Sequence, residues 1–532
     1  MPMPNRLYDG DTYQNRILPR VISWQADNNG DRLFLRQDER RFTFSDTDAL
    51  VRRYAQGLYE MGLRKGDVLA LLMKPSPDLV LVAFGAARLG AIFMPLCTDY
   101  KAAFLGNSFE LSRARILVVD ADLHERLAGA STMATIEHVI VNGDCPGHVG
   151  MTLEHLADNP GTLAEGDIHP SDPAIVWWSS GTTGRPKGVT HTHSSTVYRG
   201  WRGGQKLAAD DVLYACTPMY LGSPWNVSIW QSLVGAGQTA IDPAFSVSRF
   251  WDRIRYYQAT STILLGAMHV HLLQAPERPD DRDHTLRNGF FVPLRYDQMD
   301  TYRQRFGIQT FPQAFGASET TTIFEAPDDG TPWKNGALGR PVAHYEVQLQ
   351  DDDGNEVPVG EIGEICLRPR KPDIMFSGYF GDPEATLKVM TNYWYHVGDT
   401  AWKDEDGIYY FCGRKKDYIR YKGRNIALGE VEELLAAMPG ISTVAAYGVQ
   451  SEEVESEFEL AVAAVPLESA TLQPLDIARF IDENAPYYLV PRYIDCVESL
   501  PLNGHGRVVK EVLSKSSPRK WDAKAEGFRP SR

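Results

Sequence analysis

The sequence predicts an α/β fold: a large N-terminal domain of parallel sheets flanked by helices, a β-rich subdomain, and a small α+β C-terminal domain. Before Gly339, short apolar runs alternate with amphipathic segments, as in parallel strands covered by helices. After Gly339, short strand-like runs are separated by Gly, Pro and Asp turns. A charged, glycine-led break at 413–417 precedes a last unit near the smallest independent size. We therefore expect domains at 1–415, with the β-rich subdomain at about 339–415, and at 416–532.

The spacing of apolar residues predicts the individual elements. Residues 45–61 keep helical spacing, and Gly62 ends that helix. The same criteria predict helices at 78–89, 225–234, 428–437 and 474–484, and strands at 68–73, 91–96, 116–119, 139–141, 212–216, 259–265, 444–449 and 460–465. The chain from Ser514 onward is polar, so we expect a frayed tail.

The composition excludes several classes of partner. The formal net charge of the 532 residues is −15, and such a surface repels nucleic acid and anionic lipid. Six scattered cysteines without a Cys-x-x-Cys pair argue against a disulfide framework or a zinc site and favour a reduced, cytoplasmic setting. Residues 1–26 lack the apolar core of a signal peptide. The most apolar stretch, 79–97, contains Arg88 and Pro95, so we expect a core helix and a strand there and no membrane span.

A stretch rich in Gly, Ser and Thr follows an apolar run at 174–178 that we interpret as a buried strand; it reads Ser179-Ser180-Gly181-Thr182-Thr183-Gly184-Arg185-Pro186-Lys187-Gly188. Glycines let backbone N–H groups converge, hydroxyls add donors, and the lysine adds positive charge, which together suit phosphate oxygens. The same composition also predicts an ordinary polar turn. The P-loop motif is excluded because Lys187 is followed by Gly188 and not by Ser or Thr. The position after a buried strand favours a phosphate loop of another kind.

Five motifs in this order resemble the adenylate-forming superfamily, which includes acyl-CoA synthetases, adenylation domains of peptide synthetases, and luciferases. They are SSGTTGRPKGV, FGASE, YHVGD, GRKKDYIRYKGRNIALGEVE and LPLNGHGRVVK, and they span nearly the whole chain. The resemblance implies that the C-terminal domain is mobile and follows a hinge. It also implies activation of a carboxylate with ATP to give acyl-AMP and pyrophosphate. In the CoA ligases of this group, the C-terminal domain then swings and a thiol attacks the adenylate.

The resemblance also assigns roles to particular residues. The phosphate-holding set is Ser179, Ser180, Gly181, Thr182, Thr183, Gly184 and Lys187. Ser318 corresponds to a threonine that contacts the α-phosphate, and Glu319 corresponds to the glutamate linked to magnesium. The nucleoside set is Phe315 and Gly316 at the adenine, with Asp399 and Arg414 at the ribose hydroxyls; Lys416 holds the hinge position. Taken singly, Asp399 is better interpreted as a turn residue after Gly398 and Glu319 as a solvated charge; the other motifs favour the functional roles.

The chain departs from the family pattern near its end. The family carries Gly-Lys-x-x-Arg, and the lysine pairs with the substrate carboxylate and α-phosphate during adenylation; here Arg507 takes the lysine position and Lys510 the arginine position. Lysine is a compact point charge and arginine a wide planar fork, so the exchange predicts a weakened adenylation half-reaction, although a tolerated swap of cations is the alternative. The hypothesis is that a separate adenylating enzyme supplies acyl-AMP and this protein transfers the acyl group to CoA and releases AMP. It resembles the non-adenylating acyl-CoA ligases of platensimycin-type diterpenoid pathways, which belong to antibiotic biosynthesis.

The acyl and CoA sites are expected from the same comparison. The histidine of the family's Pro-Leu-Phe-His is absent, because Leu221 takes its place. The expected acyl pocket contains Tyr220, Trp225, Phe290 and Phe291, which suggests a hydrophobic acid, although both phenylalanines equally suit a strand core. The expected CoA contacts are Lys422, Gly423 and Arg424, although solvated surface charges are the favoured interpretation of the two cations.

Three alternatives to a non-adenylating CoA ligase stay open. The first is a complete ATP-dependent acyl-CoA synthetase, and the second is an adenylation enzyme that loads a carrier protein. The third is an inactive nucleotide-binding regulator, against which the retained Ser318, Glu319 and Asp399 argue. Nothing in the sequence favours luciferase-type oxidation. The implied small molecules are an acyl substrate, CoA and AMP, with ATP and Mg²⁺ if adenylation is retained.

Overall fold

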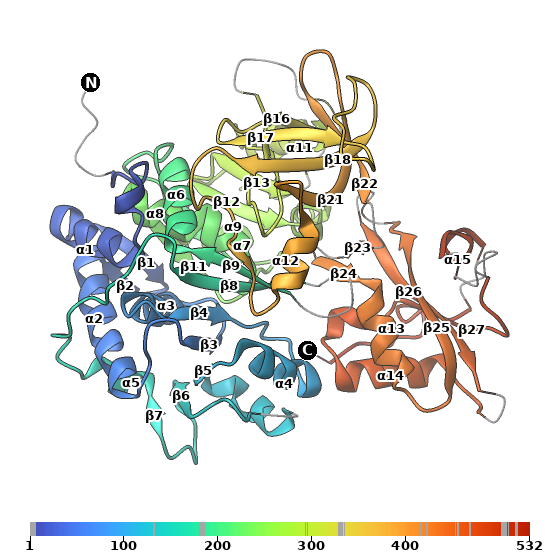
Figure 1. Ribbon diagram of the computed structural model, residues 1–532, viewed down its shortest axis with the longest axis horizontal. Coiled ribbons are helices and arrows are strands. Elements are labelled where there is room, and N and C mark those ends of the chain that lie inside the picture. The colour runs from blue at the N-terminus through green and yellow to red at the C-terminus, as the bar shows by residue number, and fades with distance from the viewer. Residues whose placement is uncertain are drawn as a thin grey trace.

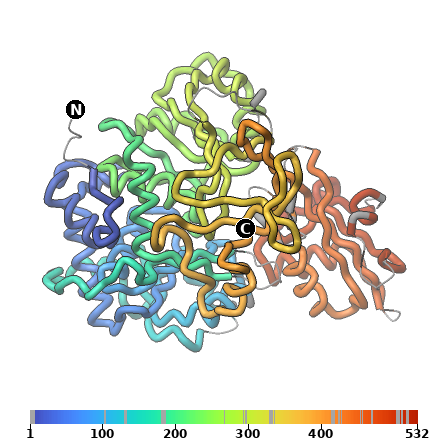
Figure 2. The backbone as a smooth tube through the Cα atoms, turned by 45° about the horizontal axis from the view of Figure 1, so that its top comes forward, coloured from blue at the N-terminus to red at the C-terminus, as the bar shows by residue number. Residues whose placement is uncertain are grey.

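The computed structural model describes residues 7–130, 133–179, 187–292, 294, 296–327, 334, 336–414, 418–421, 424–452, 454, 457–467, 470–501, 508, 510–516 and 520–531. Three sheets and their helices form the N-terminal part. A smaller α+β unit lies beside it, orange to red in Figure 1, and the tube in Figure 2 shows the same separation from a second direction. This is the α/β architecture that the sequence predicts.

The first sheet contains the two strands that flank the phosphate loop. Its order is β7-β6-β5-β3-β4-β8-β9-β19, in which the pairs from β7 to β8 are parallel and the last two pairs are antiparallel. The strands are β3 Val68–Leu72, β4 Ile92–Pro95, β5 Ile116–Asp120, β6 His138–Asn142, β7 Met151–Thr152, β8 Pro173–Ser179, β9 Lys187–Thr192 and β19 Gly378–Tyr379. The two ends of the loop are held together because Ser179 pairs with Lys187.

The second sheet has the order β13-β12-β10-β11-β1-β2, and only its β1–β2 pair is antiparallel. Its strands are β1 Leu33–Gln37, β2 Arg40–Thr43, β10 Val212–Ala215, β11 Gln238–Ile241, β12 Ser261–Leu265 and β13 Asn288–Val292. One apolar core joins this sheet to the first through helices between them, and β1, β3, α2 and α3 all contribute to it. The helices of this part are α1 Leu18–Asn29, α2 Phe44–Glu60, α3 Pro77–Arg88, α4 Ala102–Ser112, α5 Leu153–Ala157, α6 His193–Gly204, α7 Gly222–Pro224, α8 Trp230–Gly235, α9 Phe250–Tyr257, α10 Ala267–Gln274 and α11 Tyr296–Phe306.

The third sheet is antiparallel and has the order β14-β15-β16-β22-β21-β18-β17, with β20 beside β21. Its elements are β14 Ala314–Phe315, β15 Phe324–Glu325, β16 Ala337–Pro341, β17 Tyr345–Gln350, β18 Gly363–Pro369, α12 Pro383–Val389, β20 Met390–Thr391, β21 Trp394–Lys403 and β22 Tyr409–Arg414. The β-rich unit therefore begins at β14, before the expected position near residue 339.

The C-terminal unit pairs a hairpin with a three-stranded sheet of order β25-β26-β27. Its elements are β23 Tyr418–Tyr421, β24 Arg424–Ala427, α13 Leu428–Ala436, β25 Ile441–Gln450, β26 Phe458–Pro466, α14 Pro474–Asn484, β27 Tyr493–Cys496 and α15 Lys510–Ser516. In Figure 1, α13 and α14 lie on the side of the N-terminal part, and α15 lies at the far edge of this unit.

Local sequence explains the helix at 45–61 that the spacing predicts. The observed helix α2 spans Phe44–Glu60, and Thr43 caps it by accepting a hydrogen bond from the Asp46 backbone, while the Asp46 carboxylate accepts one from Thr43. This reciprocal pair satisfies two backbone donors that the first helical turn leaves open. The apolar helix expected at 225–234 is also present, but it begins as a π-helical turn, Trp225–Ile229, before α8.

The expectation of a frayed tail is wrong for residues 520–531. Trp521 and Phe528 pack against the C-terminal core, and the Ile494 amide donates to the Trp521 carbonyl at 3.2 Å. At Ser531, the Lys101 ammonium of the N-terminal part donates to the hydroxyl at 2.8 Å, and the Ser531 amide donates to Asp482 of α14 at 2.8 Å. Two aromatic anchors in an otherwise polar segment are enough to hold it against the fold.

Across the described ranges, the search for a helix long and apolar enough to cross a membrane found none. The expected core helix within 79–97 is α3, which is buried on nearly every side.

Candidate active site

A cavity of about 360 Å³ lies between the N-terminal sheets and the C-terminal unit. Three groups of residues line it. The polar side chains are Ser179, Ser223, Asn226, Ser318, Thr321 and Thr322, beside the backbone of Gly316 and Ala317; the apolar and aromatic group includes Pro95, Tyr100, Phe104, Trp178, Tyr220, Leu221, Val227, Ile263, Leu265, Phe290, Val292 and Phe315; the C-terminal group is Arg420, Ile426, Glu430, Tyr488 and Leu489. Hydrogen-bonding groups together with apolar walls suit a molecule that has both a polar and an apolar part.

A tight turn at residues 315–323 provides several of the lining residues. Phe315 ends β14, and the backbone then folds back, with the Thr321 amide donating to the Ala317 carbonyl at 2.7 Å and the Ile323 amide to the Phe315 carbonyl at 2.8 Å. A Cβ atom on Gly316 would lie 1.2 Å from the Thr321 carbonyl oxygen, so only glycine fits this turn. The turn brings Phe315, Gly316 and Ser318 to one wall of the cavity, as the sequence analysis expects for a nucleotide site.

The first sheet provides the two described ends of the phosphate loop, Ser179 and Lys187. Ser179 lines the cavity at the end of β8, and Lys187 begins β9. The Lys187 ammonium lies 4.5 Å from the ring centre of Tyr379, and the Tyr379 hydroxyl donates to a Glu319 carboxylate oxygen at 2.8 Å. The remaining expected loop residues, Ser180, Gly181, Thr182, Thr183 and Gly184, lie outside the described residues.

A buried histidine, His191, contacts the backbone of Ser318, and no motif in the sequence predicted this contact. His191 Nε2 lies 2.8 Å from the Ser318 carbonyl oxygen, so its N–H donates there. Complete burial, and the neighbouring Arg199 guanidinium, lower the pKa of His191 well below its usual value, so the ring is neutral. The ring lies within the Thr-His-Thr-His run that follows the phosphate loop. That run is the only signal in the sequence, and it does not distinguish a supporting histidine from a surface one.

The two expected ribose contacts are adjacent on the third sheet. Asp399 on β21 is 8% exposed and pairs in register with Arg414 on β22. The side chain of Arg414 lies outside the described residues. Asp399 is not among the described residues that line the cavity, so its contact with ribose hydroxyls stays a prediction from the sequence.

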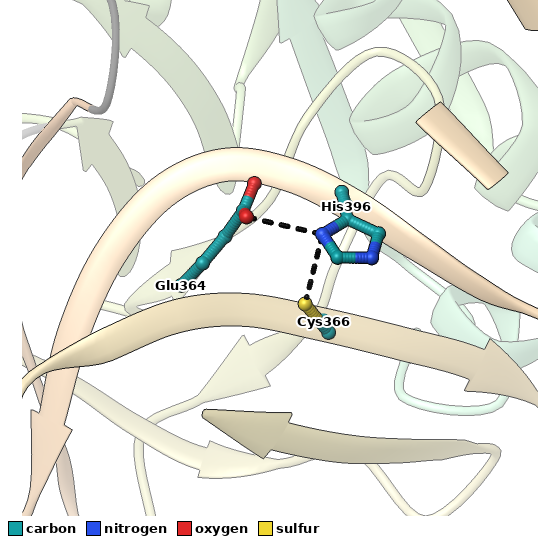
Figure 3. Close-up of side chains that lie close together, drawn as sticks. All are labelled: Glu364, Cys366 and His396. Atoms are coloured by element: carbon teal, nitrogen blue, oxygen red, sulfur yellow. Dashed lines mark hydrogen bonds and ion pairs between the residues drawn. The ribbon is translucent and has the colours of Figure 1, made fainter. Parts of the chain in front are cut away.

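Three side chains form a compact group on β18 and on β21, the strand that also carries Asp399. Figure 3 shows the His396 Nδ1 atom facing both partners, at 3.0 Å from a Glu364 oxygen and 3.3 Å from the Cys366 sulfur. These donors are near enough together for one cation, but hydrogen-bond contact alone explains both distances. We interpret the group as side-chain contacts that hold β21, the strand of Asp399, against β18.

Two of the four residues expected in the acyl pocket line the cavity. Tyr220 and Phe290 line the cavity. Trp225 and Phe291 do not, because each is fully buried in a core: the Trp225 indole donates to the Met219 carbonyl at 2.7 Å, and Phe291 packs against Tyr302. The reason is strand alternation, since Phe290 and Phe291 are consecutive on β13 and point to opposite faces.

Several expected C-terminal residues lie outside the described residues, namely Lys416, Lys422, Gly423 and Arg507; Arg424 belongs to β24, but its side chain is not described. The described neighbours of Arg507 contact other elements of the C-terminal unit. Val508 packs with residues of β25, and Lys510 pairs with Glu432 at 2.9 Å. The charged side chains among the described lining residues, Arg420 and Glu430, both belong to the C-terminal unit.

The fold and the cavity define a nucleotide-dependent enzyme built from a large α/β part and a C-terminal cap. Comparison with known families agrees: the AMP-binding enzyme family matches residues 22–380, and the AMP-binding enzyme C-terminal domain matches residues 430–507. The chain belongs to the AMP-binding enzyme family, and it is an acid–thiol ligase of the adenylate-forming superfamily.

Individual relatives place the chain among CoA ligases. It is 30% identical over 489 residues to a crotonobetaine/carnitine–CoA ligase of Salmonella arizonae, covering 89% of this chain and 93% of the relative. Among solved structures, it is similar in fold to an amide bond synthetase from Marinactinospora thermotolerans, with a TM-score of 0.81 at 23% identity over 93% of this chain and 99% of that one. It is also similar to an o-succinylbenzoate CoA synthetase from Bacillus subtilis, with a TM-score of 0.78 at 21% identity over 93% and 98%.

Proposed function

We propose that this AMP-forming acyl-CoA ligase mainly or only catalyses the second half-reaction, in which a hydrophobic acyl group passes from a preformed acyl-AMP to CoA. The observation that carries the proposal is the pairing of a cavity of about 360 Å³, lined by Ser179, Gly316 and Ser318, with Arg507 in the place of the adenylating lysine. The cavity retains Ser179, Ser318 and Gly316, so a phosphate and a nucleoside still have their wall.

The C-terminal unit contributes Arg420, Ile426 and Glu430 to the cavity wall. Lys510, the described cation nearest in sequence to position 507, pairs with Glu432 of α13 at 2.9 Å. An ammonium already paired with a carboxylate is poorly suited to replace the adenylating lysine, which supports a weakened first half-reaction.

The proposed step is balanced without any further reagent. The CoA sulfur forms a bond to the acyl carbonyl carbon, and the bond from that carbon to the phosphate oxygen breaks. AMP leaves with the bonding electron pair, and the thiol proton passes to solvent. Donors on the turn at Ser318 would stabilise the charge that develops on the leaving phosphate. Glu319 fits a magnesium ion by chemistry, since a carboxylate is a hard oxygen ligand.

The cavity walls support a hydrophobic acid. Much of the described lining is apolar or aromatic, with Tyr220, Phe290 and Leu265 among the lining residues. A betaine is the second candidate, since relatives are named for crotonobetaine and carnitine and aromatic faces also attract quaternary ammonium groups. Turnover of a panel of acyl-AMPs that contains both classes distinguishes them.

The test measures the two half-reactions separately. Exchange of labelled pyrophosphate into ATP reports adenylation, and release of AMP from synthetic acyl-AMP with CoA reports thioester formation. We expect rapid thioester formation with feeble exchange, and we expect Arg507→Lys to raise exchange by about 100-fold, because misfit of the cation costs a few kcal/mol in the transition state.

The matched control is Arg479→Lys, an exposed position on α14, which should leave both rates unchanged. Wild-type exchange equal to that of Arg507→Lys would overturn the loss of adenylation and leave a complete synthetase. Thioester formation only with a phosphopantetheinyl carrier protein would identify the carrier-loading alternative. Binding of AMP without any thioester product would identify the regulator.

A further inference from the structure

A short segment after β18, residues 376–380, forms hydrogen bonds both with β9, the strand that begins at Lys187, and with the turn at Ser318 and Glu319. Within it, the Phe376 amide donates to the Glu319 carbonyl at 2.7 Å, the Ser377 amide to the Thr190 carbonyl at 2.8 Å, and the Phe380 amide to the Gly188 carbonyl at 2.7 Å. Residues 376–380 therefore contact β9 and the Ser318–Glu319 turn at once. Nothing in the five family motifs of the sequence analysis covers this segment.

Tyr379 is the side chain of this segment that touches both functional groups. Its backbone pairs with Val189, two residues beyond Lys187. The centre of its ring lies 4.5 Å from the Lys187 ammonium nitrogen, and its hydroxyl donates a hydrogen bond to a Glu319 carboxylate oxygen at 2.8 Å. The side chain is only 8% exposed, so water has little access to replace the hydroxyl.

The tyrosine is itself held rigidly. Its amide donates to the Thr386 hydroxyl of α12 at 2.9 Å, and its ring packs edge-on against Phe376. The neighbouring Tyr395 is fully buried, and Glu319 and a hydrogen bond with Tyr379 help to raise its pKa further. A rigid aromatic group with a cation on its face and a carboxylate on its hydroxyl fixes the separation of those two charges.

We propose that Tyr379 is a positioning residue that keeps Lys187 and Glu319 at the spacing a nucleotide phosphate requires. The ring face attracts the ammonium by a cation–π interaction. The hydroxyl donates one hydrogen bond to one carboxylate oxygen and leaves the other oxygen for a ligand. Each contact uses a different part of the side chain, so the two effects can be separated by substitution.

Tyr379→Phe keeps the ring under Lys187 and removes the contact to Glu319, whereas Tyr379→Leu removes both. The first readout is binding of MgATP and of adenosine by calorimetry. We expect Tyr379→Leu to weaken MgATP binding by about 10- to 100-fold, since a cation–π contact and a hydrogen bond to a charged group are both lost, and Tyr379→Phe to weaken it less. Adenosine binding should stay within about two-fold in both variants, because adenosine has no phosphate.

The second readout is thioester formation from acyl-AMP, which rests on the proposed function. We expect Tyr379→Phe to lower kcat by about 10-fold or more with an unchanged KM for CoA. Tyr379→Phe added to Glu319→Ala should cost far less than it does alone, because each substitution removes the hydrogen bond between the two side chains. The control is Tyr409→Phe, a tyrosine of the same core that is 4% exposed and does not line the cavity.

Equal losses of MgATP and adenosine binding would show a structural role and overturn the proposal, as would wild-type MgATP binding in Tyr379→Leu. Additive effects of Tyr379→Phe and Glu319→Ala would overturn the contact to Glu319. An absence of thioester formation in the wild type would count against the proposed function alone, because the binding measurements test Tyr379 independently of it.

Discussion

The turn at Gly316 provides the sharpest test of the candidate site. A methyl group at this position would lie 1.2 Å from the Thr321 carbonyl oxygen and 2.4 Å from its carbon. Carbon and oxygen atoms rarely approach closer than about 3.3 Å, so Gly316→Ala must open the turn by about 2 Å. Backbone on both sides of the contact leaves no flexible side chain that could move instead.

The expected magnitude follows from the bonds that this opening strains. The Thr321-to-Ala317 and Ile323-to-Phe315 hydrogen bonds, at 2.7 and 2.8 Å, close the turn. Loss of both, at about 1 kcal/mol each and more where the groups stay buried, lowers the free energy of unfolding by about 2–4 kcal/mol. Displacement of Ser318 by more than about 1 Å should lower the rate by at least about 100-fold.

The assays are urea unfolding and AMP release from acyl-AMP with CoA. The matched control is Gly222→Ala, which adds a methyl group to the same cavity but meets its nearest neighbour, the Trp177 ring, at 3.3 Å. This variant should lose less than about ten-fold in rate, because a ring atom can give way by a few tenths of an ångström. Gly316→Ala with the stability and rate of Gly222→Ala would refute the reasoning.

Two further predictions concern stability. Burial, and secondarily Glu433, raises the pKa of Glu430 to about 8, so the folded protein binds a proton more tightly than the unfolded chain does. The free energy of unfolding is therefore highest, as far as Glu430 is concerned, below the usual carboxyl pKa, and it falls as the pH rises toward 8. In urea unfolding, Glu430→Gln should reduce this fall by on the order of 2 kcal/mol. An unchanged dependence of the unfolding free energy on pH would contradict the prediction. Tyr393 has φ = 63° at a hairpin turn and is 89% exposed, so Tyr393→Gly should raise the free energy of unfolding by about 1 kcal/mol, whereas a loss would show that the ring has a partner.

Some features of the site are predictable because they are local. A phosphate loop after a buried strand, a glycine in a tight turn and a carboxylate after β-strand residues all depend on contiguous residues. Arg507 is of the same kind, since its meaning lies in one position of one motif. The helix α2 was also predictable, because its capping pair, Thr43 and Asp46, is three residues apart.

Other features depend on which face of an element meets which neighbour. Phe290 and Phe291 have the same composition and adjacent numbers, yet only Phe290 reaches the cavity, and the sheet register decides this. The antiparallel β8–β9 pair within an otherwise parallel sheet, and the aromatic anchoring of the polar tail by Trp521, are also tertiary outcomes.

The residues alone are enough to predict the α/β class, the order of the motifs and the candidate phosphate and nucleoside residues, and they show arginine at position 507 where the family pattern has lysine. Only the tertiary structure decided that Tyr379 joins Lys187 to Glu319 and that His191 supports Ser318, because these partners are 60 or more residues apart. Contacts of that kind arise from packing between sheets, and no spacing along the chain encodes them. The direction in which the C-terminal unit faces the cavity was likewise set by packing between domains.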